Sequence, residues 1–232
     1  IRRVSGASGR YFGEKGQEYC NAKFSQPWDR EQKYRINFEY FAPFFAPDQT
    51  VLDFGCGNGG MLLLIRECVN RADGLEVSPA SRAIAEEAGL FVYPSIDELP
   101  STPTYDLVVS NHVLEHVRDV CSTLERVRLA MKPGARLVVK LPFDDIHESR
   151  HRNWQRDDID FHLQTFSVRN FANVLFESGF DVESCRVVTS AAHPRLLPFK
   201  RFGLEKAAFW ALAVLKNRRQ IFAVGRVPQN SG

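Results

Sequence analysis

One acidic residue and a group of glycines stand close together in residues 51–65. Asp53 comes two positions before Gly55, and Gly57 and Gly60 follow. Apolar runs lie on both sides of this group, which predicts a strand, a tight turn and then a helix. The backbone N–H groups at the start of such a helix can bind a nucleotide cofactor, so the segment predicts a cofactor site.

The glycines alone leave two cofactor classes open. Gly55, Gly57 and Gly60 also match the dinucleotide fingerprint, which would make the protein a nicotinamide oxidoreductase. Asp53 favours the other class, because a carboxylate beside the turn attracts a cationic ligand. S-adenosylmethionine carries an ammonium and a sulfonium, whereas a dinucleotide presents an anionic pyrophosphate. We therefore expect S-adenosylmethionine as the cofactor.

Three more segments extend this pattern in chain order. Glu76 closes an apolar strand within Gly-Leu-Glu-Val-Ser-Pro, Leu-Glu-His-Val occupies residues 114–117, and Lys-Pro-Gly begins at Lys132. Together with the glycine segment they resemble the class I S-adenosylmethionine-dependent methyltransferases over residues 35–190. The likeness is greatest to the small-molecule group that includes quinone-biosynthesis and sugar-modifying methyltransferases.

The resemblance implies a fold and a set of cofactor contacts. The fold is α/β, a Rossmann-like sheet of seven mostly parallel strands with helices on both faces and the last strand antiparallel. Glu76 would bind the two ribose hydroxyls, since a carboxylate offers two acceptor oxygens. At the adenine, Ser95 stands where relatives often carry an acid, so either Ser95 or Asp97 makes that contact. The residues implied to bind the cofactor are Asp53, Gly55, Cys56, Gly57, Glu76, Val77, Ser95, Ile96, Asn111 and His112.

The reaction places a second demand on the site. Methyl transfer from a sulfonium is an in-line displacement, and a hydroxyl acceptor must also lose a proton to a base or a metal. His147 and His151 follow the fifth expected strand and are the predicted catalytic bases, with a solvated surface loop as the alternative. Their spacing of four, beside Asp144 and Asp145, could also hold a metal, but no ligand spacing repeats and we expect none.

Other histidines and acids of this region receive more modest roles. His162 either orients substrate or caps and packs a neighbouring element. His116 is expected to be structural, and Glu115 is expected to cap or pair with a neighbour.

Strands and helices alternate along the chain, which predicts a mostly parallel sheet covered on both faces. A helix is also expected from Asp29 to about Phe45, before Pro47. Ser78 followed by Pro79 predicts a capped helix start. The expected strands are 50–54, 72–77, 91–94, 105–110, 135–142, 180–189 and 220–227, and the expected helices between them are 59–70, 79–88, 119–131 and 168–178.

A chain of 232 residues fits one methyltransferase domain, 1–232, with two additions. The first is an N-terminal lid over residues 1–46, whose first 28 residues are expected to be loose. The second is a helical basic insertion over residues 190–219, before the last strand. Residues 143–166 also interrupt the alternation, and with these additions they are where substrate choice should reside.

Charge and cysteine content bound the partners and the compartment. The net charge of +2 decides nothing about nucleic acid. Five scattered cysteines without a Cys-x-x-Cys pair indicate thiols in a reducing cytoplasm. No apolar run approaches a membrane span, and no signal peptide is evident.

The basic segment 194–219 encloses an apolar run over residues 207–215. A helix that is apolar all round needs burial, so we expect a protein contact such as a homodimer, then a peripheral membrane or lipid-linked substrate contact, then an anionic soluble substrate. Nucleic acid is not expected, because the aromatic residues stand in apolar runs.

These observations lead to one function and its alternatives. We expect a methyltransferase that uses S-adenosylmethionine to methylate a hydroxyl of a small-molecule or sugar-like acceptor. Nitrogen or carbon acceptors stay open because the family contains both. A protein that holds the cofactor without turning it over is a further alternative, as the base is not fixed by the sequence.

Overall fold

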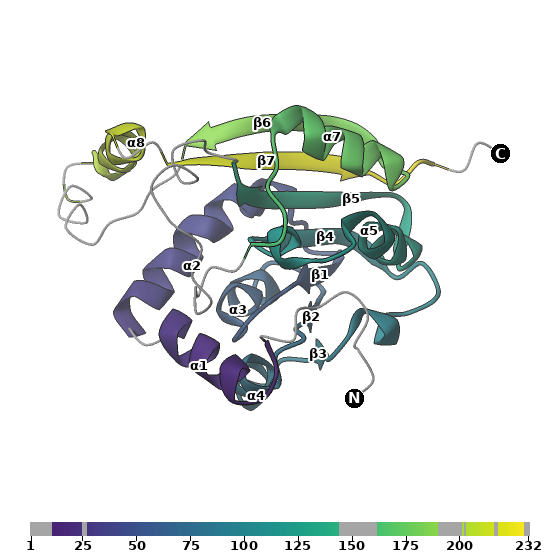
Figure 1. The fold of residues 1–232 in the computed structure, drawn as a ribbon, viewed down its shortest axis with the longest axis horizontal. Helices are drawn as coiled ribbons and strands as arrows, with labels where there is room; N and C mark the ends of the chain where they lie inside the picture. The colour runs from purple at the N-terminus through teal and green to yellow at the C-terminus, as the bar shows by residue number, and fades with distance from the viewer. Residues whose placement is uncertain are drawn as a thin grey trace.

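A computed structural model of the chain describes residues 11–24, 27–143, 162–189, 201, 203–215 and 218–229. Its centre is a seven-stranded sheet in the order β3-β2-β1-β4-β5-β7-β6, which Figure 1 shows from β3 at the bottom to β6 at the top. The strands are β1 (Thr50–Phe54), β2 (Arg71–Leu75), β3 (Val92–Tyr93), β4 (Tyr105–Asn111), β5 (Met131–Pro142), β6 (Asp181–Thr189) and β7 (Arg219–Arg226).

The direction of the strands agrees with the expected fold class. The neighbouring pairs among β1 to β5 are parallel, and β7 is antiparallel to both β5 and β6. Strand order reverses between β1 and its two neighbours, β2 and β4, which is the place where open α/β sheets bind ligands. The prediction of seven mostly parallel strands with an antiparallel last strand is confirmed.

Alternate residues of the central strands pack into separate cores on the two faces. Leu52 and Val108 belong to the core that α5 (Val120–Leu129) and α7 (Val168–Glu177) cover. Val51 and Val109 belong to the core covered by α2 (Pro27–Phe41) and α3 (Gly60–Arg66). Helices therefore bury both faces of the sheet, and this explains the consecutive apolar residues at the middle of β1 and β4.

The helix ends follow the residues that the sequence provides for them. Ser78 Oγ accepts a hydrogen bond from the Ser81 N–H at the start of α4 (Pro79–Glu87). Asp119 and Ser167 cap α5 and α7 in the same way. Gly89 follows α4 with a φ of +74°, a conformation that suits glycine.

The N-terminal region differs from the expectation. Residues 13–24, expected to be loose, form a helix, α1 (Gly13–Phe24), so the expectation of a loose segment is wrong there, while the lid over residues 1–46 stays a prediction. The helix expected from Asp29 begins at Pro27 and ends at Phe41, and a 3-10 turn, η2 (Ala42–Phe44), follows it. Proline is favoured at the first position of a helix, which accounts for the earlier start.

The basic insertion is described only in part. Its apolar run forms α8 (Glu205–Leu215), which contacts β6 near the edge of the sheet (Figure 1). Among the described helices, none has the length and hydropathy that a membrane span requires.

Candidate functional site

The candidate site lies where β1, β2, β3 and β4 end at their carboxyl sides. Asp53 of β1 pairs in register with Gly74 of β2 and with Val109 of β4. Because these strands are parallel, the segments that follow them emerge along one edge of the sheet. The topology thus brings the glycine turn, Glu76, Ser95 and Asn111 to a common edge, as the sequence predicts.

The glycine turn is tied to the end of β2. The backbone N–H groups of Gly55 and Cys56 both donate to the carbonyl of Leu75, at 2.8 and 3.1 Å. Gly55 has a φ of +82° and a Cβ there would overlap with Cγ2 of Val113. Gly57 also has a positive φ, of +56°. Residue 55 therefore requires glycine, and the backbone conformation of residue 57 favours it.

Tyr34 covers the other side of this turn. Its hydroxyl donates to Oδ1 of Asn58, and a Cβ on Gly60 would overlap with its ring. Helix α2 thus holds the glycine turn in place, a role that the aromatic spacing of the sequence did not reveal.

Glu76 is oriented by backbone donors on both of its oxygens. The N–H of Gly57 donates to Oε2 at 3.0 Å, and the N–H of Ser78 donates to Oε1 at 2.7 Å. Burial raises the pKa of this carboxyl more than these hydrogen bonds and Arg82 lower it. A carboxylate can accept more than one hydrogen bond per oxygen, so Glu76 retains acceptor capacity for a ligand.

Asp53 is almost completely buried beside this carboxylate. Desolvation, followed by the charge of Glu76, raises the pKa of Asp53 to about 8. Its Oδ2 accepts no hydrogen bond from any residue that the structure describes. A buried acceptor without a donor is costly, so the position fits a ligand that brings a positively charged donor. The same arrangement disfavours an anionic pyrophosphate.

The remaining predicted cofactor residues surround this edge. Cys56 is buried against Leu62 and Val92, and burial raises its thiol pKa. Val77 and Ile96 are partly buried against one shared apolar core. Ser95 precedes the 3-10 turn η3 (Ile96–Glu98), directly after β3. The structure thus brings all ten predicted cofactor residues to the ends of four neighbouring strands.

The end of β4 has an unusual backbone. His112 has a φ of +57°, the one positive φ among the described non-glycine residues. Its N–H donates to the carbonyl of Lys140 at 2.8 Å, and the chain then turns into η4 (Leu114–His116). Oδ1 of Asn111 is buried without a partner among the described residues. Such strain is typical of a site where backbone direction serves a function.

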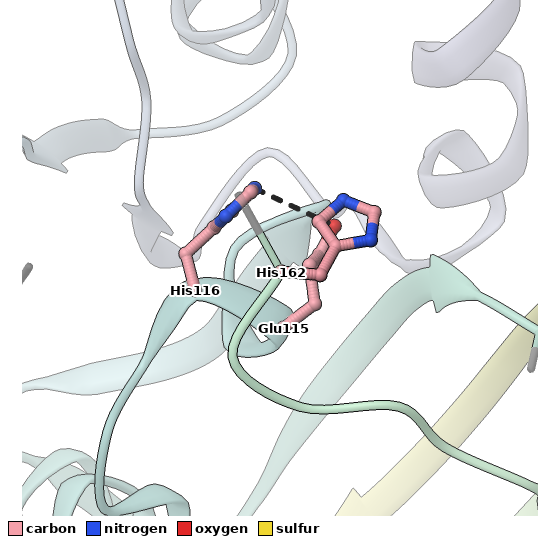
Figure 2. Close-up of side chains that lie close together, drawn as sticks. All are labelled: Glu115, His116 and His162. Carbon is pink, nitrogen blue, oxygen red and sulfur yellow. Dashed lines mark ion pairs between the residues drawn. The ribbon is translucent and has the colours of Figure 1, made fainter. Parts of the chain in front are cut away.

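Three imidazoles surround the buried carboxylate of Glu115. Its Oε1 lies 3.3 Å from Nδ1 of His112 and 4.0 Å from Nε2 of His116. Burial alone would raise the pKa of Glu115, but His112 and then His116 outweigh it and lower the pKa. The ring of His162 lies 5.0 Å from that of His116, centre to centre (Figure 2). Glu115, expected to cap or pair with a neighbour, thus pairs with two imidazoles, and His116, expected to be structural, is one of them.

Two polar residues of the neighbouring strands escaped prediction from the sequence. Gln220 of β7 places its amide nitrogen 3.2 Å from Nε2 of His112. Lys140 of β5 is buried, donates to Oδ1 of Asn37 at 2.7 Å and lies over the ring of Tyr40. A lysine inside an apolar strand was the signal that could have identified this position.

The predicted bases lie outside the described residues. His147 and His151 fall within residues 144–161, so their place relative to the edge stays a prediction. Asp144 and Asp145, which could join them in a metal site that we do not expect, also lie outside the described residues.

Comparisons with known proteins agree with this geometry. A family model described as a methyltransferase domain matches residues 28–185. A tRNA U34 carboxymethyltransferase from Shewanella piezotolerans is 32% identical over 124 residues, which are 48% of this chain and 38% of that protein. The chain thus spans less than two fifths of that relative.

Two solved structures share the fold across most of the chain. A methyltransferase from Haloferax volcanii in complex with the activator Trm112 has a TM-score of 0.66 and 19% identity, covering 90% of this chain and 98% of its own. Magnesium protoporphyrin IX methyltransferase from Synechocystis, with S-adenosylmethionine bound, has a TM-score of 0.60 and 12% identity. The match covers 94% of this chain and 93% of that chain. At these identities, the likeness is one of fold.

Proposed function

Because the chain belongs to the class I S-adenosylmethionine-dependent methyltransferases, we propose that it methylates a hydroxyl oxygen of a small, sugar-like molecule. The observation that supports an oxygen acceptor is the group of imidazoles around Glu115, at the edge of the sheet where the donor would bind. A hydroxyl must give up a proton as it attacks, whereas an amine needs only to arrive neutral.

The donor end of the site is proposed to hold S-adenosylmethionine through two carboxylates. Asp53 would receive the ammonium group, since its buried Oδ2 has no donor among the described residues. Glu76 would accept the ribose hydroxyls, because Gly57 and Ser78 already fix the direction of its oxygens. Ser95 or Asp97 would reach the adenine from the turn after β3. When bound, S-adenosylmethionine supplies a methyl group activated by a sulfonium.

The acceptor end is proposed to use His112 to position or deprotonate the hydroxyl. Its side chain is 35% exposed, so it is open to an acceptor, while Glu115 contacts its Nδ1. A carboxylate on one ring nitrogen favours a proton on that nitrogen and leaves Nε2 to accept one. The amide nitrogen of Gln220 lies 3.2 Å from Nε2 and would orient the ring in the free protein. This contact would have to open for Nε2 to accept a proton from the hydroxyl.

His147 and His151 stay our proposed catalytic bases. Both follow Pro142, the last residue of β5, and β5 pairs with β4 next to His112. Either imidazole would take the hydroxyl proton while His112 aligns the acceptor, so the two roles can be tested separately.

The exclusion of nucleic acid as an acceptor is not retained. The Shewanella piezotolerans relative is named for a tRNA modification, so an RNA acceptor becomes the second candidate function. Nitrogen and carbon acceptors also stay alternatives. The imidazole group around Glu115 favours the hydroxyl over these acceptors, and an acceptor screen distinguishes them.

Segment 194–219 is proposed to contact a second copy of the chain or a lipid-linked acceptor. In the described part of α8, Trp210 is 62% exposed and Leu215 is 84% exposed. Large apolar side chains in such positions are typical of an interaction surface.

We also propose that the whole chain forms one domain and acts in the cytoplasm.

A labelled-methyl transfer screen tests the function. The protein is incubated with methyl-labelled S-adenosylmethionine and three separate panels: sugars and phenols, total tRNA, and ribosomal protein. The last panel is included because a relative from Burkholderia mallei, 31% identical over 111 residues, is named as a ribosomal protein L11 methyltransferase. We expect label in an ether-linked methyl group of a small hydroxylated acceptor, lost in Asp53→Asn and kept in Glu177→Gln. Glu177 is an exposed acid of α7 and serves as the matched control. Label on the tRNA or protein panel alone would overturn the proposal.

A further inference from the structure

We propose that Glu115, His116 and His162 form a binding site for a divalent transition-metal cation of the Co²⁺ or Zn²⁺ type. Each of these residues offers one ligand atom, and the three atoms lie within 4.8 Å of one another. Figure 2 shows Glu115 and His116 on the turn after β4, with His162 meeting them from a separate segment.

Backbone hydrogen bonds assemble this cluster from two distant parts of the chain. The N–H groups of Leu163 and Gln164 donate to the backbone carbonyl of Glu115, at 2.8 and 3.0 Å. The side chain of Gln164 also donates to the carbonyl of Arg118 at 3.3 Å. His162 is therefore anchored next to Glu115 by its immediate neighbours, and this pairing does not depend on the imidazole itself.

The carboxylate at the centre lacks ordinary hydrogen-bond partners. Glu115 is 1% exposed. Neither of its oxygens accepts a hydrogen bond of normal geometry from a residue that the structure describes. Its ion-pair partners there are imidazole nitrogens, at 3.3 Å for His112 and 4.0 Å for His116. A buried anion held in this way is stabilised strongly by a cation.

The donor set fits a transition metal better than Mg²⁺ or Ca²⁺. One carboxylate oxygen and two imidazole nitrogens are the ligands that zinc, cobalt and iron prefer, whereas the harder cations prefer oxygen alone. With bonds of about 2.0 to 2.2 Å, ligand atoms in a tetrahedral site lie about 3.3 to 3.6 Å apart. Ligand atoms up to 4.8 Å apart would need to close by as much as about 1.2 to 1.5 Å. His162 is not buried, so its side chain can rotate to make this adjustment.

Surrounding residues support the ligands. His112 contacts the same Oε1 of Glu115 that faces His116, and its backbone is held in the left-handed conformation. The ring of Tyr11 packs edge-on against His116, with 5.9 Å between ring centres. Such neighbours fix the orientation of a ligating side chain and raise the affinity of a metal site.

Three protein ligands leave at least one coordination position open. A hydroxyl oxygen bound there would have its pKa lowered by the cation, so its proton would leave more readily to a nearby base. This role rests on the proposed function, whereas binding of the metal does not.

Titration of the purified, chelator-treated protein with Co²⁺ tests the site without any acceptor. The visible absorption of Co²⁺ reports its coordination, and a thiolate ligand would add a separate near-ultraviolet band. We expect one Co²⁺ per chain, bound through nitrogen and oxygen. His162→Ala should bind at least tenfold more weakly, whereas His193→Ala, which removes a histidine outside the described residues, should bind as the wild type does.

Calorimetry with S-adenosylhomocysteine on the same samples keeps the two proposals apart. Unchanged binding of this ligand to His162→Ala would show that the variant is folded and that its donor site is intact. No Co²⁺ binding by the wild type, a thiolate band, or equal Co²⁺ affinity in His162→Ala would overturn the metal site, and none of these results would contradict the methyltransferase proposal.

Discussion

Asp53 is buried beside Glu76, and the charge of Glu76 adds to burial in raising the pKa of Asp53 to about 8. The two acids are not equivalent. Glu76 receives two backbone N–H groups, while Oδ2 of Asp53 accepts no hydrogen bond from the described residues. We therefore expect Asp53 to be mostly neutral at pH 7 in the free protein and to ionise when a cationic group binds beside it.

This pKa predicts how the stability of the free protein depends on pH. The pKa of Asp53 is about 8 in the folded state against 3.8 for a solvated aspartate side chain. The folded state thus binds more protons than the unfolded state between these values, and the contribution of Asp53 to stability is lost as the pH rises towards 8. Asp53→Asn should gain stability relative to the wild type across this range.

Urea denaturation of both proteins from pH 5 to pH 8 measures this difference. Glu177→Gln removes an exposed acid and should follow the wild-type curve. A constant difference between Asp53→Asn and the wild type over the whole range would show that Asp53 is ionised in the folded protein.

The same group predicts the pH dependence of cofactor binding. The ammonium of S-adenosylhomocysteine favours ionised Asp53, so binding should release a proton below pH 8 and tighten as the pH rises from 6 to 8. Calorimetry in two buffers of different ionisation enthalpy counts that proton. Asp53→Asn should bind more weakly, by about 1 to 3 kcal/mol, and with no pH dependence of this origin. Equal proton release by wild type and Asp53→Asn would assign the proton to another group.

Gly55 predicts a steric effect on the cofactor turn. An alanine there is strained by the φ of +82°, and its Cβ overlaps with Val113. Gly89 also has a positive φ, of +74°, but a Cβ there meets nothing within 4 Å, so Gly89→Ala is the matched control. Gly55→Ala should lower the free energy of unfolding by about 1 to 3 kcal/mol more than Gly89→Ala.

Removal of the obstructing side chain checks this cause. Gly55→Ala combined with Val113→Ala should recover part of the loss, relative to the sum of the two single variants in urea denaturation. Strict additivity of the two changes would mean that contact with Val113 is not the reason for glycine at this position.

The predicted bases make a kinetic prediction. Once an acceptor is identified, one of the two variants, His147→Ala or His151→Ala, should lack the base. The methyl-transfer rate of that variant should fall by about 10²-fold or more. The dependence of this rate on a group that titrates near pH 6.5 should also disappear. Rates measured from pH 5 to pH 9 test this. Identical pH profiles for both variants and the wild type would leave His112 as the candidate base.

Local sequence signals predicted most of the fold but less of the site. The strand at residues 50–54, the helix start at Ser78 and the helix expected over residues 168–178 could be predicted directly, because apolar runs and caps act within a few residues. The helix from Gly13 to Phe24 was missed, since its sequence has no clear apolar face. The composition of the first 28 residues favoured a loose segment, but residues 13–24 are helical in the structure.

The site residues show the same division. Asp53, Gly55 and Glu76 follow strands in a recognisable pattern, and the register of the sheet brings them together. Glu115 and His162 are 47 positions apart, and backbone hydrogen bonds from Leu163 and Gln164 to the carbonyl of Glu115 help to bring them together. Pairing of this kind depends on tertiary structure and leaves no local signal.

Calorimetric titration with S-adenosylhomocysteine and with NAD tests the central claim most directly. We predict that the wild type binds S-adenosylhomocysteine and not NAD. Glu76→Ala should weaken that binding by about 1 to 3 kcal/mol, because the ribose hydroxyls lose their acceptor, while Glu177→Gln binds normally. Binding of NAD alone, or S-adenosylhomocysteine binding that Glu76→Ala leaves unchanged, would contradict the assignment of this edge of the sheet as the donor site.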